Sequence, residues 1–470
     1  MYAFMIIMSI HKGHTMTIFA KRALLEAGWV ENTRLDISKG HIVGIHCDAM
    51  PEPGDVCVDT LLPALANLHS HSFQRAMAGM TEFRAKGRES FWTWRDLMYR
   101  FLEHLTPEHV TAFAALTFME MQKAGYASVG EFHYVHHQTG GQAYDDPAEL
   151  SHSIFEAANQ TGIGLTHLPV LYTYGGADGQ GLSGGQLRFG NSVEAFNDLV
   201  SRCQTAAKTA SADTQVGIAP HSLRATSPAD LRRLLAVHST GPVHIHIAEQ
   251  QKEIAEISTH LGARPVEWLL ANTEVDARWC LIHATHMTPQ ETVDMARSGA
   301  VAGLCPITEA NLGDGAFNGP QYIAAGGAFG VGSDSNINIS LTEELRMLEY
   351  SQRLRDMERN VLVPGEGSVG AFLYKGAAQG GAQALGRNAG RINVGALADL
   401  VAIDAADVSL CALSEENLLD GLVFAANDRV VSDVWSAGRH QVQDGKHIAE
   451  AQIKAAYRVQ IADVVARING

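Results

Sequence analysis

The feature that most constrains the fold is a repeated alternation of short apolar runs and helical stretches between about residues 61 and 385. The first run is LLPALANL at residues 61–68, and seven more follow: GYASVGEF, GIGLTHLPVLY, TQVGIAPHSL, PVHIHIAEQ, RWCLIHATHMT, AVAGLCP and GAFGVGSDSN. Segments with helical periodicity, such as PADLRRLLAVHS, lie between them. Strands that alternate with helices form a parallel sheet, and eight such units can close into a barrel. We therefore predict an α/β protein with a (β/α)8 TIM-like barrel over residues 63–385.

The two ends of the chain share a different pattern. Residues 16–62 and 386–450 alternate apolar and polar residues in short runs, which are broken by glycine, asparagine and a D-G turn. Alternation with a period of two predicts half-buried antiparallel strands. We expect the two ends to pair into one small β-sandwich domain, with the barrel inserted between them. Residues 451–470 have helical periodicity and are predicted to form a C-terminal packing helix.

Composition and charge exclude several classes of protein. Apolar residues make up 46% of the chain and charged residues 18%, which is typical of a globular protein. A net charge of -16 argues against nucleic acid as a partner, because phosphate repels an acidic surface. The six cysteines form no C-x-x-C motif, so we expect a reducing cytoplasm.

The first ten residues, MYAFMIIMSI, are apolar but lack a basic region and a cleavage site. We therefore expect neither a signal peptide nor a membrane span. Met16 is a candidate natural start, because the strand pattern begins there and residues 1–15 match no element.

Polar side chains stand where several of the predicted barrel strands end. They are His69 and His71 after the first strand, His246 and Glu249 at the fifth, His283 at the sixth and Asp334 at the eighth. In such barrels the carboxyl ends of the strands meet on one face, so we expect these groups to lie together. Three imidazoles and a carboxylate, from His69, His71, His246 and Asp334, suit zinc or iron and leave Glu249 and His283 to move protons.

Each of these residues also has a simpler interpretation. An H-x-H pair occurs by chance in a chain with 22 histidines, and HIHI near position 245 is a second instance. A lone histidine at a strand end is more often structural, and Asp334 could cap the helix predicted after it. The joint placement of all six groups favours a metal site.

With these motifs, the chain resembles the amidohydrolase superfamily in its mononuclear deaminase branch. The motifs are H-x-H (His69, His71), H-x-x-E (His246 to Glu249), H-A-x-H (His283 to His286), S-D-S (Ser333 to Ser335) and GRINVGALADLVAID, which returns to the β domain. The resemblance implies one Zn²⁺ per chain, or Fe²⁺, on His69, His71, His246 and Asp334, with Glu249, His283 and Asp334 catalytic. No lysine ends the fourth strand, where binuclear members carry one, and this favours a single metal. Family members are commonly dimers, so a homodimer is expected.

The loops point to the substrate. Gln74 follows the H-x-H pair, Arg95 lies in SFWTWRDLMYRF, Tyr134 follows EFH, and His221 and Arg224 lie in PHSLR. Two arginines and a tyrosine near a metal suit a small anionic substrate, because guanidinium groups pair with carboxylates. A surface position for Arg95 and a helix-end charge for Arg224 are the alternatives.

These stretches resemble the formimidoylglutamate deiminase subfamily. The resemblance implies hydrolytic deamination of N-formimino-L-glutamate to N-formyl-L-glutamate and ammonia in histidine degradation. The alternatives are a related deaminase of the S-adenosylhomocysteine, guanine or chlorotriazine type, and a non-catalytic amidohydrolase-like scaffold. The sequence does not assign either arginine to a particular carboxylate.

Overall fold

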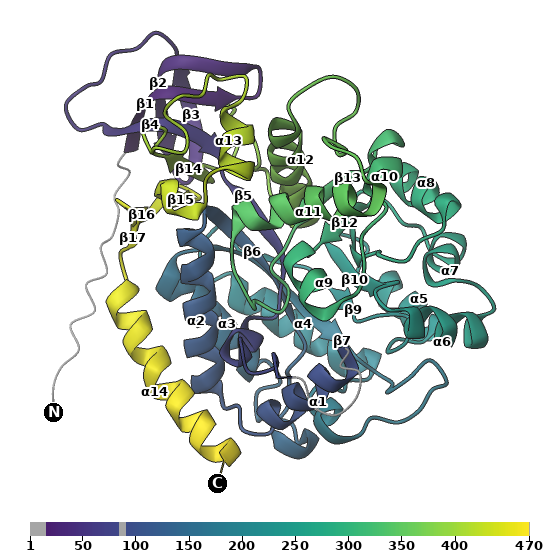
Figure 1. Ribbon diagram of the computed structural model, residues 1–470. Coiled ribbons are helices and arrows are strands. Elements are labelled where there is room, and N and C mark those ends of the chain that lie inside the picture. Colours follow the sequence, from purple (N-terminus) through teal and green to yellow (C-terminus); the bar gives the residue numbers. More distant parts are fainter. Residues whose placement is uncertain (1–15, 84–90, 470) are drawn as a thin grey trace, which may run out of the picture.

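The computed structural model describes residues 16–83 and 91–469. Residues 1–15, where we predicted neither a signal peptide nor a membrane span, lie outside the described residues. A small β domain sits beside a larger body of strands and helices, and the last helix runs along that larger body (Figure 1). None of the helices in the described ranges combines the length and the apolar character that crossing a bilayer requires.

Strands from both ends of the chain form the sheet of the β domain. The strands are β1 (Met16–Leu25), β2 (Gly28–Ser38), β3 (His41–His46), β4 (Val56–Pro63), β14 (Leu400–Ile403), β15 (Val431–Ser436), β16 (Arg439–Gln443) and β17 (Lys446–His447). Their order in the sheet is β17-β16-β15-β14-β4-β1-β2-β3. The two halves join where β4 pairs antiparallel with β14, with Thr60 opposite Ile403 and Pro63 opposite Leu400. Ile18 and Trp435 are fully buried in a core of this domain's own. The prediction that the two ends form one β domain is confirmed.

The remaining strands form the barrel. They are β5 (Leu65–Ser70), β6 (Tyr126–His133), β7 (Gly164–Leu171), β8 (Gln215–Val216), β9 (Ala219–Pro220), β10 (Val243–Ile247), β11 (Trp279–His283), β12 (Val301–Leu304) and β13 (Ala328–Val331). They pair in parallel, β5 to β9 in one group and β10 to β13 in another. Parallel bridges join the groups at both edges, from Ile218 to Val243 and from Ser70 to Asp334. Because β8 and β9 are two pieces of one strand, the described residues form a ring of eight strands, and the predicted barrel is confirmed.

Strands β5 and β13 meet at the edge where the ring of strands closes, which we call the seam. The two backbones lie close together there because β13 is followed by a glycine, Gly332. A Cβ atom on Gly332 would lie 2.7 Å from the backbone N and O of His69, which is too close for any other residue. Across the seam, Asp334 N donates to His69 O and His71 N donates to Asp334 O, both at 2.9 Å. The H-x-H segment and Asp334 are therefore held in register by main-chain hydrogen bonds.

Helices cover the outside of the barrel. The α-helices are α1 (Phe91–Leu102), α2 (Pro107–Lys123), α3 (Glu149–Thr161), α4 (Val193–Ala207), α5 (Pro228–Val237), α6 (Gln251–Leu261), α7 (Pro265–Asn272), α8 (Pro289–Ser298), α9 (Pro306–Leu312), α10 (Gly319–Ala324), α11 (Leu341–Asp356), α12 (Val369–Ala384), α13 (Leu418–Phe424) and α14 (Glu450–Asn469). The 3-10 turns are η1 (Ser72–Met77), η2 (Thr139–Gly141), η3 (Gly184–Arg188) and η4 (Asp428–Val430). Helix α14 lies along α2 (Figure 1), where His109 Nε2 is 2.9 Å from Asp463 Oδ2.

A buried ion-pair network joins the β domain to the barrel. Arg387 Nη2 lies 2.9 Å from Asp213 Oδ2 and 3.0 Å from Asp399 Oδ2, and Arg439 Nη1 lies 2.7 Å from Asp213 Oδ1. Asp213 precedes the barrel strand β8, whereas Arg439 begins β16 of the β domain. We retain as a proposal the division into a β domain (residues 16–62 and 386–450), a barrel (63–385) and a C-terminal helix (451–470).

Candidate active site

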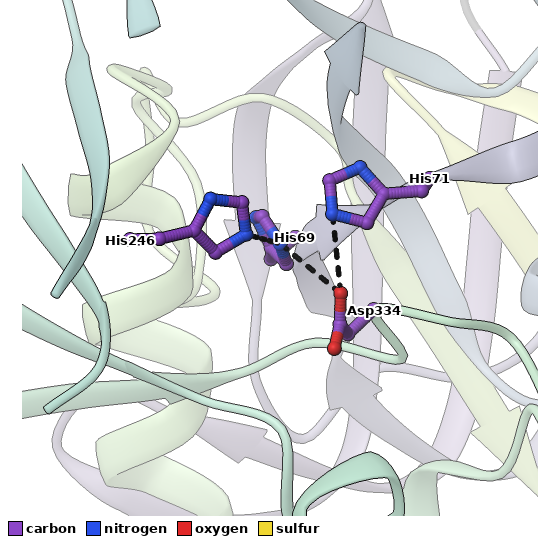
Figure 2. A group of neighbouring side chains, drawn as sticks. All are labelled: His69, His71, His246 and Asp334. Atoms are coloured by element: carbon purple, nitrogen blue, oxygen red, sulfur yellow. Dashed lines mark hydrogen bonds and ion pairs between the residues drawn. The ribbon is translucent and has the colours of Figure 1, made fainter. Parts of the chain in front are cut away.

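Four side chains that the sequence predicted as metal ligands converge at the carboxyl ends of the barrel strands. His69 belongs to β5 and His71 follows it, His246 belongs to β10, and Asp334 follows β13. One ligand atom from each lies within 4.8 Å of the others, and all four residues are buried. Figure 2 shows the three rings and the carboxylate pointing toward one another.

The distances place the nitrogen atoms and one carboxylate oxygen around a common point. His246 Nε2 lies 3.1 Å from His69 Nε2, and Asp334 Oδ1 lies 3.3 Å from His69 Nε2 and 3.2 Å from His71 Nε2. Three nitrogen atoms and one oxygen atom are a donor set that zinc and iron accept. The geometry of these side chains therefore fits a metal ion.

Hydrogen bonds to the outer ring nitrogens orient two of the imidazoles. The Nδ1 atom of His71 is 2.9 Å from the carbonyl oxygen of Phe132, and the Nδ1 atom of His246 is 3.2 Å from that of His221. A carbonyl can only accept, so each Nδ1 carries the hydrogen and each Nε2 is left with a lone pair for a metal.

A cluster of buried amides and hydroxyls holds Asp334 against the H-x-H segment. Asn67 Nδ2 donates to Ser333 Oγ at 2.7 Å, and Ser333 Oγ donates to Asn336 Oδ1 at 2.6 Å. Asn336 Nδ2 in turn donates to the carbonyl oxygens of His71 at 3.1 Å and Asp334 at 3.0 Å. Residues on both sides of the seam are thus fixed by one network.

The backbone is left-handed at several non-glycine residues beside the site. The φ angle is +53° at Ala248, +67° at His283, +48° at Ala284, +44° at Asp334 and +54° at Asn336. Each such residue costs of order 1–3 kcal/mol and persists only where its surroundings enforce it. Here the strained residues turn the chain at the ends of β10, β11 and β13, which aims the side chains into the barrel mouth.

The electrostatic environment keeps His69, His246 and Asp334 in the forms that bind metals. Burial lowers the pKa of His69 to about 3 and that of His246 well below its ordinary value. Burial alone would raise the pKa of Asp334, but the close contacts of its carboxylate with the rings of His69 and His71 hold it well below its usual range. Neutral imidazoles and an ionised carboxylate are the ligand forms of these residues.

Two further titratable groups, Glu249 and His283, lie next to the ligands. His283 Nε2 is 3.8 Å from Glu249 Oε1 and 4.0 Å from Asp334 Oδ2. Burial raises the pKa of Glu249 to about 7, although the charge of His283 opposes this. Burial alone would lower the pKa of His283, but Glu249 and the hydrogen bond to Glu309 raise it to about 10. Glu249 can thus gain or lose a proton near neutral pH, as a general acid-base residue must.

A pocket opens in front of these groups, and all five predicted substrate-binding residues line it. They are Gln74 on η1, Arg95 on α1, Tyr134 after β6, and His221 and Arg224 after β9. Gln74 Nε2 donates to the hydroxyl of Tyr134 at 2.7 Å. The guanidinium carbon of Arg95 lies 5.4 Å from the ring centre of Tyr99, and Arg224 Nη1 lies 3.5 Å from Tyr172 Oη and 3.4 Å from Gly175 O. The pocket therefore has two cationic groups apart from the metal ligands.

Sequence reasoning missed some residues of the site. Tyr172 ends the third predicted barrel strand and lines the pocket, so its position at a strand end was a signal that could have identified it. Glu309 accepts hydrogen bonds from His283 Nδ1 at 3.3 Å and from Cys305 N at 3.0 Å. It lies within the first turn of α9, and no spacing in the sequence marks it.

Comparisons with known proteins give a consistent result. A model of the amidohydrolase family matches residues 60–440, and a model described as the N-terminal domain of formimidoylglutamate deiminase HutF matches residues 15–57. The chain is 49% identical over 443 residues to a formimidoylglutamate deiminase of Pseudomonas aeruginosa, which covers 94% of this chain and 97% of the relative.

Solved structures agree with these matches. A crystal structure of an amidohydrolase from Brucella melitensis is similar with a TM-score of 0.92 and 44% identity, over 96% of this chain and 100% of that one. An adenosine deaminase from Xanthomonas campestris with bound zinc has a TM-score of 0.79 at 21% identity, over 96% and 98% of the two chains. At that identity the second likeness shows the fold alone.

Proposed function

The chain belongs to the amidohydrolase family, and we propose on this basis that its site hydrolyses N-formimino-L-glutamate to N-formyl-L-glutamate and ammonia. It is a hydrolase that acts on a C–N bond, with the formimidoylglutamate deiminase activity of histidine degradation. Both the near-full-length relative and the matching N-terminal family model carry that activity in their names.

The polarity of the pocket is the observation that carries this proposal. The guanidinium groups of Arg95 and Arg224 line a pocket that also contains Glu249 and the metal ligand Asp334. A linear substrate with two carboxylates and a formimino group matches these residues, since guanidinium binds carboxylate in a fixed fork and the formimino group can lie at the metal ligands. A neutral purine offers no carboxylate to these two guanidinium groups.

We propose Zn²⁺ as the metal, with Fe²⁺ as the alternative, because His69, His71, His246 and Asp334 offer nitrogen and oxygen donors that suit both. When bound, the ion supplies a nucleophile at neutral pH, because it lowers the pKa of bound water to roughly 7.

The side chains around the metal account for the proton movements of the reaction. Water adds to the formimino carbon, and the nitrogen that leaves must take up protons before it departs as ammonia. Asp334, which is ionised, can accept the proton of the water. Glu249, whose pKa is raised to about 7, can carry a proton to the leaving nitrogen. His283, whose raised pKa keeps it protonated, can orient the attacking oxygen through its Nε2–H.

The five proposed substrate-binding residues hold the substrate in front of the metal ligands. Arg95 and Arg224 bind the two carboxylates, and Gln74, Tyr134 and His221 line the pocket between them and the metal. We further propose that the protein is cytoplasmic and that it forms a homodimer.

An ammonia-release assay tests the proposal. The purified protein is offered N-formimino-L-glutamate, S-adenosylhomocysteine, adenosine and guanine, and its metal content is measured in parallel. We expect turnover of N-formimino-L-glutamate alone, with a strong loss in Arg95→Gln and Arg224→Gln. Arg297→Gln, on helix α8 and outside the pocket lining, should keep its activity. Faster deamination of a purine would refute the substrate, and a metal-poor protein without turnover would indicate a scaffold.

A further inference from the structure

Cys305 is a buried thiol that stands beside the proposed metal site but has no part in the proposed reaction. It directly follows β12 and is fully buried. Its sulfur atom, a ring nitrogen of His283 and a carboxylate oxygen of Asp334 lie within 4.8 Å of one another. Among the described residues, the groups that gather metal-ligand atoms in this way include Cys305 but neither Cys203 nor Cys280, although both of these are also buried.

We propose that His283, Cys305 and Asp334 form a second cation site, which shares Asp334 with the first and takes a thiophilic divalent cation such as Zn²⁺ or Cd²⁺. The sulfur donor sets its chemistry apart from the first site, which has nitrogen and oxygen donors only. Thiolate ligands select zinc and cadmium over magnesium and manganese, which prefer oxygen.

Asp334 is placed to serve both sites with different oxygen atoms. Its Oδ1 lies 3.3 Å from His69 Nε2 and 3.2 Å from His71 Nε2, whereas its Oδ2 lies 4.0 Å from His283 Nε2. A carboxylate that bridges two ions about 3.5–4 Å apart is the usual arrangement in two-metal sites. One oxygen can thus remain with the first ion while the other binds the second.

The distances require only a small adjustment. Metal–nitrogen bonds of about 2.0–2.1 Å and metal–sulfur bonds of about 2.3 Å put tetrahedral ligand atoms roughly 3.3–3.8 Å apart. The present atoms, within 4.8 Å of one another, need to close by about 1.5 Å at most. Two carboxylates near His283 add attraction for a cation, since Glu249 lies 3.8 Å and Glu309 3.3 Å from its ring nitrogens.

The cation has a route to this position. His283 and Asp334 both line the pocket, and Cys305 packs behind them in the barrel interior with Leu68 and Ile282. Binding forms bonds from the metal to the sulfur of Cys305 and to Nε2 of His283, and the S–H proton of Cys305 and the Nε2 proton of His283 leave to solvent. No electron is transferred, so no oxidant or reductant is needed.

One consequence rests on the proposed function. An ion held by His283 and Asp334 occupies two groups that the deamination uses, so excess Zn²⁺ inhibits the enzyme. Cys305 itself takes no part in catalysis, so replacing it leaves the activity at one equivalent of metal unchanged.

Cadmium titration tests the site without reference to activity. The exposed thiols of Cys47, Cys57 and Cys411 are first blocked with N-ethylmaleimide under native conditions, and the protein carries one equivalent of Zn²⁺. CdCl₂ is then added while the ultraviolet thiolate-to-cadmium charge-transfer band is recorded. We expect a band equivalent to one thiolate per chain in wild type and in Cys203→Ser, and its loss in Cys305→Ser and Cys305→Ala.

Two results would overturn the proposal. The first is the absence of the charge-transfer band in wild type. The second is a band of equal strength in a folded Cys305 variant, because this would indicate adventitious cadmium binding at another thiol. The first result needs no variant, so the proposal can be refuted even if Cys305→Ser fails to fold.

Inhibition provides the second readout. We expect the Zn²⁺ concentration that halves ammonia release to rise at least about tenfold in Cys305→Ser, with no change in Cys203→Ser. Equal inhibition of all three proteins would refute the role of Cys305. If wild type fails to release ammonia at one equivalent of Zn²⁺, the proposed function fails, while the cadmium band still decides the site.

Discussion

Replacing Glu309 by glutamine removes one charge behind His283 and almost nothing else. Glu309 is 4% exposed and does not line the pocket, and its Oε1 accepts from His283 Nδ1 and from Cys305 N. A glutamine Oε1 can accept the same two hydrogen bonds. Hydrogen bonds to charged groups contribute roughly 1.5–3 kcal/mol and neutral ones roughly 0.5–1.5, so the loss is about 1–1.5 kcal/mol. If His283 acts in the transition state, kcat falls about 5- to 13-fold.

The assay is steady-state ammonia release with the metal content measured beside it. We expect KM and metal content to stay at their wild-type values, because Glu309 does not line the pocket and is not one of the four proposed ligands of the first metal. Glu291→Gln is a matched control: Glu291 is 5% exposed, also lies in the first turn of a helix that follows a barrel strand, and is paired with Arg264 instead. A kcat within twofold of wild type, or a loss confined to KM, would show that Glu309 does not support His283.

Three further variants probe other parts of the molecule. Arg224→Gln should lower kcat/KM about 13- to 160-fold, mainly through KM, since a charge-assisted hydrogen bond worth about 1.5–3 kcal/mol is lost. An unchanged KM in the ammonia assay would contradict its role. Gly332→Ala should force the backbone of His69 away and lower the free energy of unfolding, measured with denaturant, by about 1–3 kcal/mol. It should also weaken metal binding, measured by competition with a chelator. A metal affinity equal to that of wild type would refute the close packing at this seam. Burial would raise the pKa of Asp213, but its two arginine partners lower it to about 2, below the ordinary 3.8. Ionised Asp213 therefore stabilises the fold by about 2 kcal/mol above pH 4, and this stabilisation is lost as the pH falls toward 2. The melting temperatures of wild type and Asp213→Asn should therefore converge between pH 4 and pH 2. A difference in melting temperature that stays constant over this range would contradict the role of Asp213.

Much of the fold could be predicted because its pattern is local. Each barrel strand appears in the sequence as an apolar run, and the residues that end these runs lie close together once eight strands form a ring. His246 and Asp334 were predicted as partners in this way, although they are 88 positions apart in the sequence. The two ends of the chain were predicted to pair because both have the same alternation of apolar and polar residues.

The rest depends on contacts that no local pattern encodes. Glu309 reaches His283 only because α9 starts immediately after β12, and the four residues between strand end and carboxylate carry no recognisable motif. The hydrogen bond between Asn67 and Ser333 joins residues 266 positions apart. The narrowness of the seam at Gly332 could not be predicted from a single sequence, because it is a property of two backbones in contact.

The pairing of β4 with β14 also bears on how the chain reaches its fold during synthesis. Thr60 faces Ile403, so a ribosome must add more than 300 residues between making one strand and making its partner. At about 5–20 residues per second, this takes roughly 15 to 70 s. Throughout that time one edge of β4 is exposed as an unpaired strand, which can bind another nascent chain. The β domain of this enzyme is therefore completed last, and we expect the period before β14 emerges to be the one in which chaperones matter most.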